Sequence, residues 1–237
     1  MERADLERRL AEHVDAGDTV ARDAVAHALA TTYGAAALPA LLRASVHDRN
    51  DDGESLQLDV LELFEAWPGE ARAEVLACVS SADPGLRRVG VWGLSVIDLD
   101  RRGEHVALVV EAASDPDPRV RGEALGGLGS IFGAGDPRAL AALTAGTRDP
   151  DPEVRCAAVQ GLHSWPGEAV TAVLVARAAD ADRRVRFWTA WALSGRPGAA
   201  ATLERLTADD DPDVRAAAGD VLAIGRRASG ALEHPWS

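Results

Sequence analysis

Apolar residues recur at helical spacing along the chain, and short acidic turns interrupt them at regular intervals. Val154, Ala158 and Leu162, for example, are four residues apart and share one face of a helix. Many such runs begin directly after an Asp, which is commonly followed by Pro. An Asp at this place accepts the free amides of the first turn, and Pro suits the first helical position. The pattern predicts helices that begin at these Asp residues and bury one apolar stripe.

The segments that begin with Asp form an internal repeat. The sequence Asp117-Pro118-Arg119-Val120-Arg121 returns with small changes at 151–155, 182–186 and 211–215, fits at 83–87, and fits more loosely at 53–57 and 18–22. The apolar anchor of each segment is at position 21, 56, 86, 120, 154, 185 or 214. A second repeat, Trp67-Pro68-Gly69-Glu70-Ala71, returns at 165–169. Each unit therefore reads as helix A, a turn and helix B, and neighbouring units must stack to bury their apolar stripes.

These repeats resemble HEAT repeats, in particular the short bacterial type called bilin-lyase HEAT-like, over about residues 2 to 225. The resemblance implies an all-α fold, a right-handed α-solenoid (α-α superhelix) of about seven HEAT-like helical hairpins. We expect one solenoid over 1–225, with weak units over 1–66 and clear repeats over 67–225, followed by a C-terminal tail at 226–237. The name of the repeat implies no lyase activity, because a fold carries no function by itself.

The resemblance also implies a ladder in which Asp and Arg side chains join successive turns. Its arginines would be the residues directly after the apolar anchors, with Gln57 interrupting the row: Arg22, Arg87, Arg121, Arg155, Arg186 and Arg215. We interpret these arginines as structural.

Composition narrows the choice of partner. The 237 residues carry 25 basic and 38 acidic side chains, a formal net charge of -13, and every basic residue is Arg. The charge disfavours a nucleic-acid partner, because phosphate contacts need clustered positive charge. Two cysteines cannot form a disulfide framework, and no run of 18 apolar residues predicts a membrane span. We expect a cytoplasmic protein without a membrane partner, and the lysine-free, alanine-rich composition suggests a bacterial source.

The predicted binding surface follows the helix-B residues at the second, sixth and ninth positions after each anchor, here named the B face. In such solenoids helix B lines the concave side. Gly122, Gly126 and Gly129 leave this face bare in one unit, between Trp92 on one side and Trp191 on the other. The candidate binding residues on the B face are Glu62, Glu65, Arg88, Trp92, Gly122, Gly126, Gly129, Cys156, Gln160, His163, Phe187 and Trp191. The competing interpretation is that the glycines permit close helix packing and the tryptophans belong partly to the core.

One loop resembles a calcium site. Asp48, Asn50, Asp52 and Asp59 follow the spacing of an EF-hand loop, except that Asp replaces the final Glu. A longer solvated turn between two helices explains the same residues, so we expect no metal and no cofactor. Catalytic motifs such as HExxH or a Ser-His-Asp elbow are absent from the sequence.

The sequence favours a non-catalytic scaffold or adaptor that binds a protein or peptide through its concave face. Acidic residues favour a basic partner, and one such role is that of an immunity or antitoxin protein. The alternative is a small-molecule-binding or enzymatic solenoid with a pocket over the three glycines, between Trp92 and Trp191.

Overall fold

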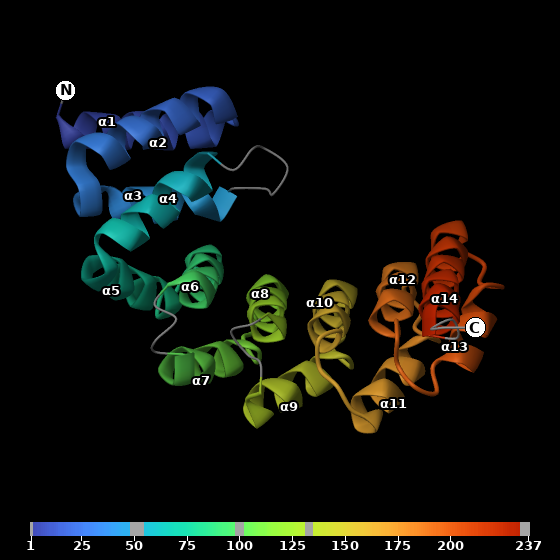
Figure 1. The fold of residues 1–237 in the computed structure, drawn as a ribbon. Coiled ribbons are helices and arrows are strands. Elements are labelled where there is room, and N and C mark those ends of the chain that lie inside the picture. Colours follow the sequence, from blue (N-terminus) through green and yellow to red (C-terminus); the bar gives the residue numbers. More distant parts are fainter. Residues whose placement is uncertain (1, 48–54, 98–101, 131–134, 233–237) are drawn as a thin grey trace. The chain divides into compact units, whose positions relative to one another are not determined.

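The computed structural model describes residues 2–47, 55–97, 102–130 and 135–232, and all regular structure in these ranges is helical (Figure 1). Helices alternate between the predicted A and B positions of the repeat. The prediction of an all-α fold built from helical hairpins is confirmed. The chain forms two compact units, Met1–His105 and Val106–Ser237, so the single domain over 1–225 stays a prediction.

Unit 1 contains three hairpins and the first residues of a seventh helix. Its elements are α1 (Arg3–Ala16), α2 (Thr19–Tyr33), η1 (Gly34–Ala37), α3 (Leu38–Ala44), η2 (Ser45–His47), α4 (Ser55–Ala66), α5 (Pro68–Val79), α6 (Pro84–Val96) and the start of α7 (Arg102–Ala112). Helices α2, α4 and α6 are the B helices; each packs on the A helix that precedes it or on the short element beside it, and α2 also packs against α4. The fully buried leucines Leu10, Leu29, Leu56 and Leu94 come from four different helices and form the core.

Unit 2 repeats the hairpin more regularly. After the rest of α7 come α8 (Pro118–Gly129), α9 (Pro137–Gly146), α10 (Pro152–Leu162), α11 (Glu168–Arg177), α12 (Arg183–Ala192), α13 (Ala200–Leu206) and α14 (Pro212–Leu232). The B helices pack in order, α8 on α10, α10 on α12 and α12 on α14. The last of them, α14, continues to Leu232, into the segment predicted as a tail.

The Asp residues cap the B helices as the sequence predicts. Asp83, Asp117, Asp151 and Asp182 each accept the amide N–H two residues later, at 2.7 or 2.8 Å. The backbone of each cap is extended, and Pro follows three of the four, so each cap satisfies one of the amides that a helix start leaves free.

Within unit 2, three of the predicted arginines form the ladder. Arg121 donates two hydrogen bonds to Asp149, both of 2.8 Å, and Arg155 and Arg186 do the same to Asp180 and Asp209 at 2.8 to 3.0 Å. Each of these carboxylates also accepts the amide of the next N-cap Asp, at 2.9 or 3.0 Å. Each guanidinium therefore ties the turn of its own hairpin to that of the next.

One apolar stretch belongs to the core of unit 1. Thr19–Ala44 has a mean hydropathy of 1.3 over an 18-residue window, and 56% of that window is buried inside the fold. Leu29, Leu38 and Leu41 are fully buried, and η1 interrupts the helix. These apolar residues therefore serve the contacts among α1 to α4.

Candidate functional site

In unit 1 the candidate residues lie on α4 and α6. Glu62 and Glu65 are exposed, whereas Arg88 donates a hydrogen bond of 3.2 Å to the carbonyl of Val46. The Trp92 ring is half-buried and lies 6.0 Å from that of Phe64, which is buried. Arg88 and Trp92 therefore hold α6 against the preceding elements, and only the two glutamates stand fully exposed.

The three glycines of α8 differ from one another. A Cβ at Gly122 or Gly126 would meet nothing within 4 Å, so the surface over these two residues is open. A Cβ at Gly129 would lie 2.1 Å from the Cα of Gly161. The backbones of α8 and α10 touch at this crossing, which only glycine permits. Gly129 therefore serves helix packing, while Gly122 and Gly126 leave surface uncovered.

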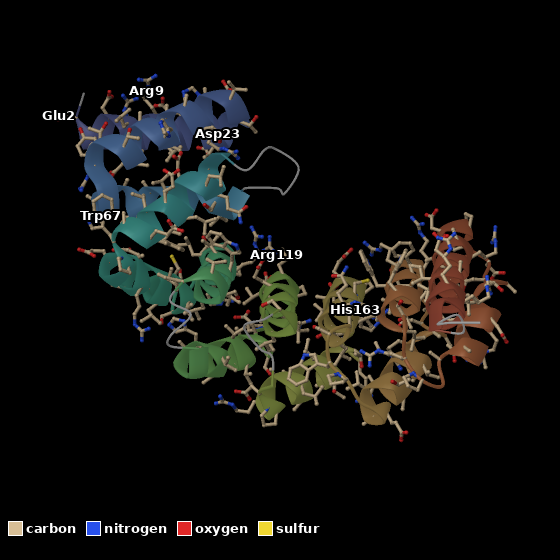
Figure 2. The ribbon with its side chains drawn as sticks, in the orientation of Figure 1. Glu2, Arg9, Asp23, Trp67, Arg119 and His163 are labelled. Carbon is tan, nitrogen blue, oxygen red and sulfur yellow. The ribbon has the colours of Figure 1, made fainter. Side chains whose placement is uncertain are left out.

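On α10 the candidate residues also divide between core and surface. Cys156 is buried, and burial raises the pKa of its thiol to about 11, so the thiol stays protonated at neutral pH. Gln160 and His163 are exposed near the C-terminal end of the helix, where Figure 2 shows His163. Cys156 therefore belongs to the core and does not form part of the exposed face.

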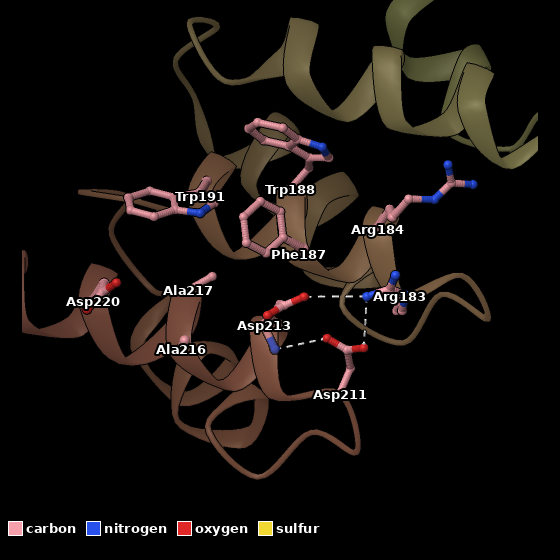
Figure 3. Close-up of a pocket in the computed structure, with 10 residues that line it drawn as sticks. All are labelled: Arg183, Arg184, Phe187, Trp188, Trp191, Asp211, Asp213, Ala216, Ala217 and Asp220. Atoms are coloured by element: carbon pink, nitrogen blue, oxygen red, sulfur yellow. Dashed lines mark hydrogen bonds and ion pairs between the residues drawn. The ribbon is translucent and has the colours of Figure 1, made fainter.

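Phe187 and Trp191 lie together at an open pocket of about 620 Å³ between α12 and α14 (Figure 3). Trp188 joins them with 38% of its surface exposed, and its ring meets that of Phe187 edge to face at 5.2 Å. The residues that line the pocket are Arg183, Arg184, Phe187, Trp188, Trp191, Asp211, Asp213, Ala216, Ala217 and Asp220. Three aromatic side chains from one helix thus face two alanines on the next.

The charges around this pocket sum to a negative value. Arg183 forms ion pairs with Asp211 at 3.2 Å and with Asp213 at 3.4 Å. Arg184 pairs with Glu153 and, at 3.3 Å, with Asp182. Asp220 is exposed, and no ion pair joins it to another described residue. Two guanidinium groups therefore stand against five carboxylates.

Sequence reasoning found the two aromatic residues on the B face and missed the third. Trp188 is the third residue after its anchor Val185, and the predicted face included only the second, sixth and ninth. A helix places residues three and four apart on one side, so Arg184, Trp188 and Trp191 share a face that a wider stripe would have included. The repeat predicts a capping role for Asp211 and places Asp213, Arg183 and Arg184 in its segments without a role at a site.

The calcium-loop candidate is only partly described. Asp48, Asn50 and Asp52 lie outside the described residues. Asp59 lies on α4, buried, with its Oδ1 atom 2.8 Å from Nδ1 of His27. Among the described residues no three His, Cys, Asp or Glu side chains gather as metal ligands would. Asp59 therefore serves a contact between α2 and α4.

Comparison with solved structures shows the same fold in other repeat proteins. YibA of E. coli aligns with a TM-score of 0.59 and 17% identity, covering 75% of this chain and 67% of YibA. An engineered protein aligns at 0.55 and 17% identity, over 93% of this chain and 73% of its own. A designed armadillo repeat protein, solved in complex with the peptide (KR)4, aligns with a TM-score of 0.50 and 18% identity, over 78% of this chain and 98% of its own.

Comparison with curated proteins found no match. The sequence profile described as HEAT repeats matches residues 72–149 and 142–223, which is more than half of the chain. These two matches cover the hairpins from α5 to α14 in which the capping Asp and the ladder recur. The chain belongs to the HEAT-repeat family.

Proposed function

We propose that the protein is a non-catalytic adaptor that binds a basic protein or peptide through the B face of unit 2. The observation that carries this proposal is the group of three aromatic side chains at the pocket between α12 and α14. Aromatic residues that border a hollow are the usual anchors of protein interfaces, where they contribute most of the binding energy. An open pocket suits a polypeptide that crosses it better than an enclosed small molecule.

The negative charge of the protein supports a positively charged partner. The net charge of -13 and the excess of carboxylates around the pocket both attract a basic surface and speed its approach. The designed armadillo repeat protein, a helical-repeat protein, was solved with the basic peptide (KR)4, which agrees with a positively charged partner. A cytoplasmic immunity or antitoxin protein that neutralises a basic toxin is one form of the role.

The remaining B-face candidates fit the edge of such an interface. Gly122 and Gly126 on α8 have open space above them, and Gln160 and His163 on α10 are exposed. A partner anchored at the aromatic residues of α12 would lie over these polar and small residues as it follows the B helices.

A quantitative pull-down from an extract of the source cells tests the proposal. The bait is the full chain, wild type or with Trp188→Ser and Trp191→Ser together. We expect the double variant to lose the partners that the wild type retains, and we expect high salt to release them from the wild type. A double variant with an unchanged helical circular dichroism spectrum that captures the same partners equally well would place binding elsewhere.

A further inference from the structure

Resting on the proposed function, we infer that the end of the pocket between Trp191 and Asp220 binds an arginine side chain of the partner. Trp191 comes from the last turn of α12 and Asp220 from α14, and Figure 3 shows both on the same side of the pocket. The indole offers a flat surface for a cation, and the carboxylate offers two acceptors beside it.

The protein already binds a guanidinium in this pocket with groups of the same kind. At the other end, Arg183 of the chain itself lies between the carboxylates of Asp211 and Asp213, and Phe187 is one helical turn away on α12. The end with Trp191 and Asp220 repeats this combination of an aromatic ring on α12 and a carboxylate on α14. Asp220, however, has no arginine of the chain within ion-pair distance in the described residues.

The two arginines of the pocket do not turn it into an anion site. Arg183 is held by two carboxylates, and Arg184 is held by Glu153 and Asp182. Because each guanidinium is held by two carboxylates of the chain, neither is left to attract an anion. The carboxylates around the pocket outnumber the guanidinium groups by three, and Asp220 is the one that no described arginine holds. A cationic group of the partner therefore meets attraction here, whereas an acidic one meets repulsion.

The chemistry of an indole and a carboxylate favours arginine over lysine. A guanidinium is flat, so it can lie against the Trp191 ring while its N–H groups fork onto the two oxygens of Asp220. A lysine ammonium is compact and more strongly hydrated, and cannot make both contacts in one plane. Ala216 and Ala217 of α14 line the pocket between Asp213 and Asp220, and their small side chains leave room for the methylenes of the entering residue.

Fluorescence anisotropy with three labelled octapeptides tests the inference. Alanine alternates in the peptides with arginine, lysine or citrulline, and citrulline keeps the shape of arginine without its charge. We expect the arginine peptide to bind the full chain more tightly than the lysine peptide, and the citrulline peptide to bind weakest. We expect Asp220→Asn and Trp191→Leu each to weaken binding of the arginine peptide about tenfold.

Two matched variants control for general charge and for general loss of an indole. Glu204→Gln removes one exposed carboxylate from α13, and Trp165→Leu removes one indole from the loop after α10, both outside the pocket lining. Each should change the affinity less than about twofold.

Equal binding of the arginine and citrulline peptides, or of the arginine and lysine peptides, would overturn the inference. So would binding that Asp220→Asn and Trp191→Leu leave unchanged, and so would the absence of binding by any of the three peptides. In each case the pull-down still decides the proposed function, because Trp188 and Trp191 can anchor a partner without receiving an arginine.

Discussion

The arginine position of the B helices makes different contacts in the first two hairpins of unit 1 and in unit 2. In unit 2, Arg121, Arg155 and Arg186 each bond to the carboxylate of the following turn. In unit 1, Arg22 bonds to its neighbour Asp23, and Gln57 stands at the next position. There α2 and α4 are joined by the pair of His27 and Asp59 instead. In the third hairpin Arg87 donates to the carbonyls of Ser81 and Ala82, as the unit 2 arginines do to the carbonyls of their own turns. The sequence repeats most faithfully where this side-chain ladder joins the hairpins, and it varies where other contacts replace it.

The largest expected effect is the loss of one arginine of the ladder. Arg155→Ala removes a two-pronged ion pair in which the Asp180 side chain is only 5% exposed, and two further bonds to the carbonyls of Asp149 and Pro150. The nearly buried carboxylate then keeps only the longer ion pair with Arg177, at 3.7 Å, and the amide of Asp182, so we expect a loss of about 3 kcal/mol in the free energy of unfolding. Urea denaturation followed by circular dichroism measures it.

The end of the repeat offers a matched control. Arg215 holds the same repeat position and donates to the carbonyls of Asp209 and Asp210, but α14 is the last helix of the described residues, and no turn after it receives the guanidinium there. Arg215→Ala should therefore cost about 1 kcal/mol or less. Equal losses from the two variants would show that the bond to the next turn contributes nothing to stability.

The next largest effect concerns the contact between α8 and α10. Gly129→Ala places a methyl group where the Gly161 backbone lies, so the helices must separate, at a cost of about 2 kcal/mol. Gly126→Ala enters open space on the same helix and should stabilise the protein by up to about 1 kcal/mol, because alanine favours helix. Melting temperatures that shift in the same direction would contradict the difference between the two glycines.

These glycines also show how far the sequence alone could lead. The capping Asp and the Asp–Arg ladder were predictable because each depends on a short motif that recurs. Gly126 and Gly129, in contrast, are the same residue type on the same face of one helix. Gly161, whose backbone covers Gly129 and leaves Gly126 open, lies in the next hairpin. Only the packing of α8 on α10 shows which glycine is covered.

The pocket was predictable only in part for the same reason. Phe187 and Trp191 follow from helical periodicity within α12 alone. The acidic wall of the pocket comes from α14 and from Asp211 directly before it. The pairing of Arg183 with Asp211 and Asp213 depends on how α12 and α14 pack. The exposure of Trp188 was not predictable either, because its position in the sequence also fits a residue turned toward the core.

A smaller effect should appear in acid. The hydrogen bond from Arg186 lowers the pKa of Asp209, and that from Arg184 lowers the pKa of Asp182. Because these pKa values are lower in the folded than in the unfolded protein, their contribution to stability is present above about pH 4 and is lost as the pH falls through the folded values. We expect the urea midpoint to fall with acidification, and to fall less steeply in Asp209→Asn. Equal slopes would exclude a contribution of the ladder.

The smallest effect tests the pair that takes the place of the ladder in unit 1. The hydrogen bond with Asp59, and then its charge, raise the pKa of the exposed His27, with a lesser contribution from Glu62. Because the pKa is higher in the folded state, the pair stabilises unit 1 below about pH 6.5 and ceases to do so as the pH rises through the folded value. NMR titration of the His27 ring should show a fall in its pKa in Asp59→Asn and a smaller fall in Glu62→Gln. If Asp59→Asn leaves the titration unchanged, the two side chains are not bonded in solution, and α2 and α4 are joined by apolar packing alone.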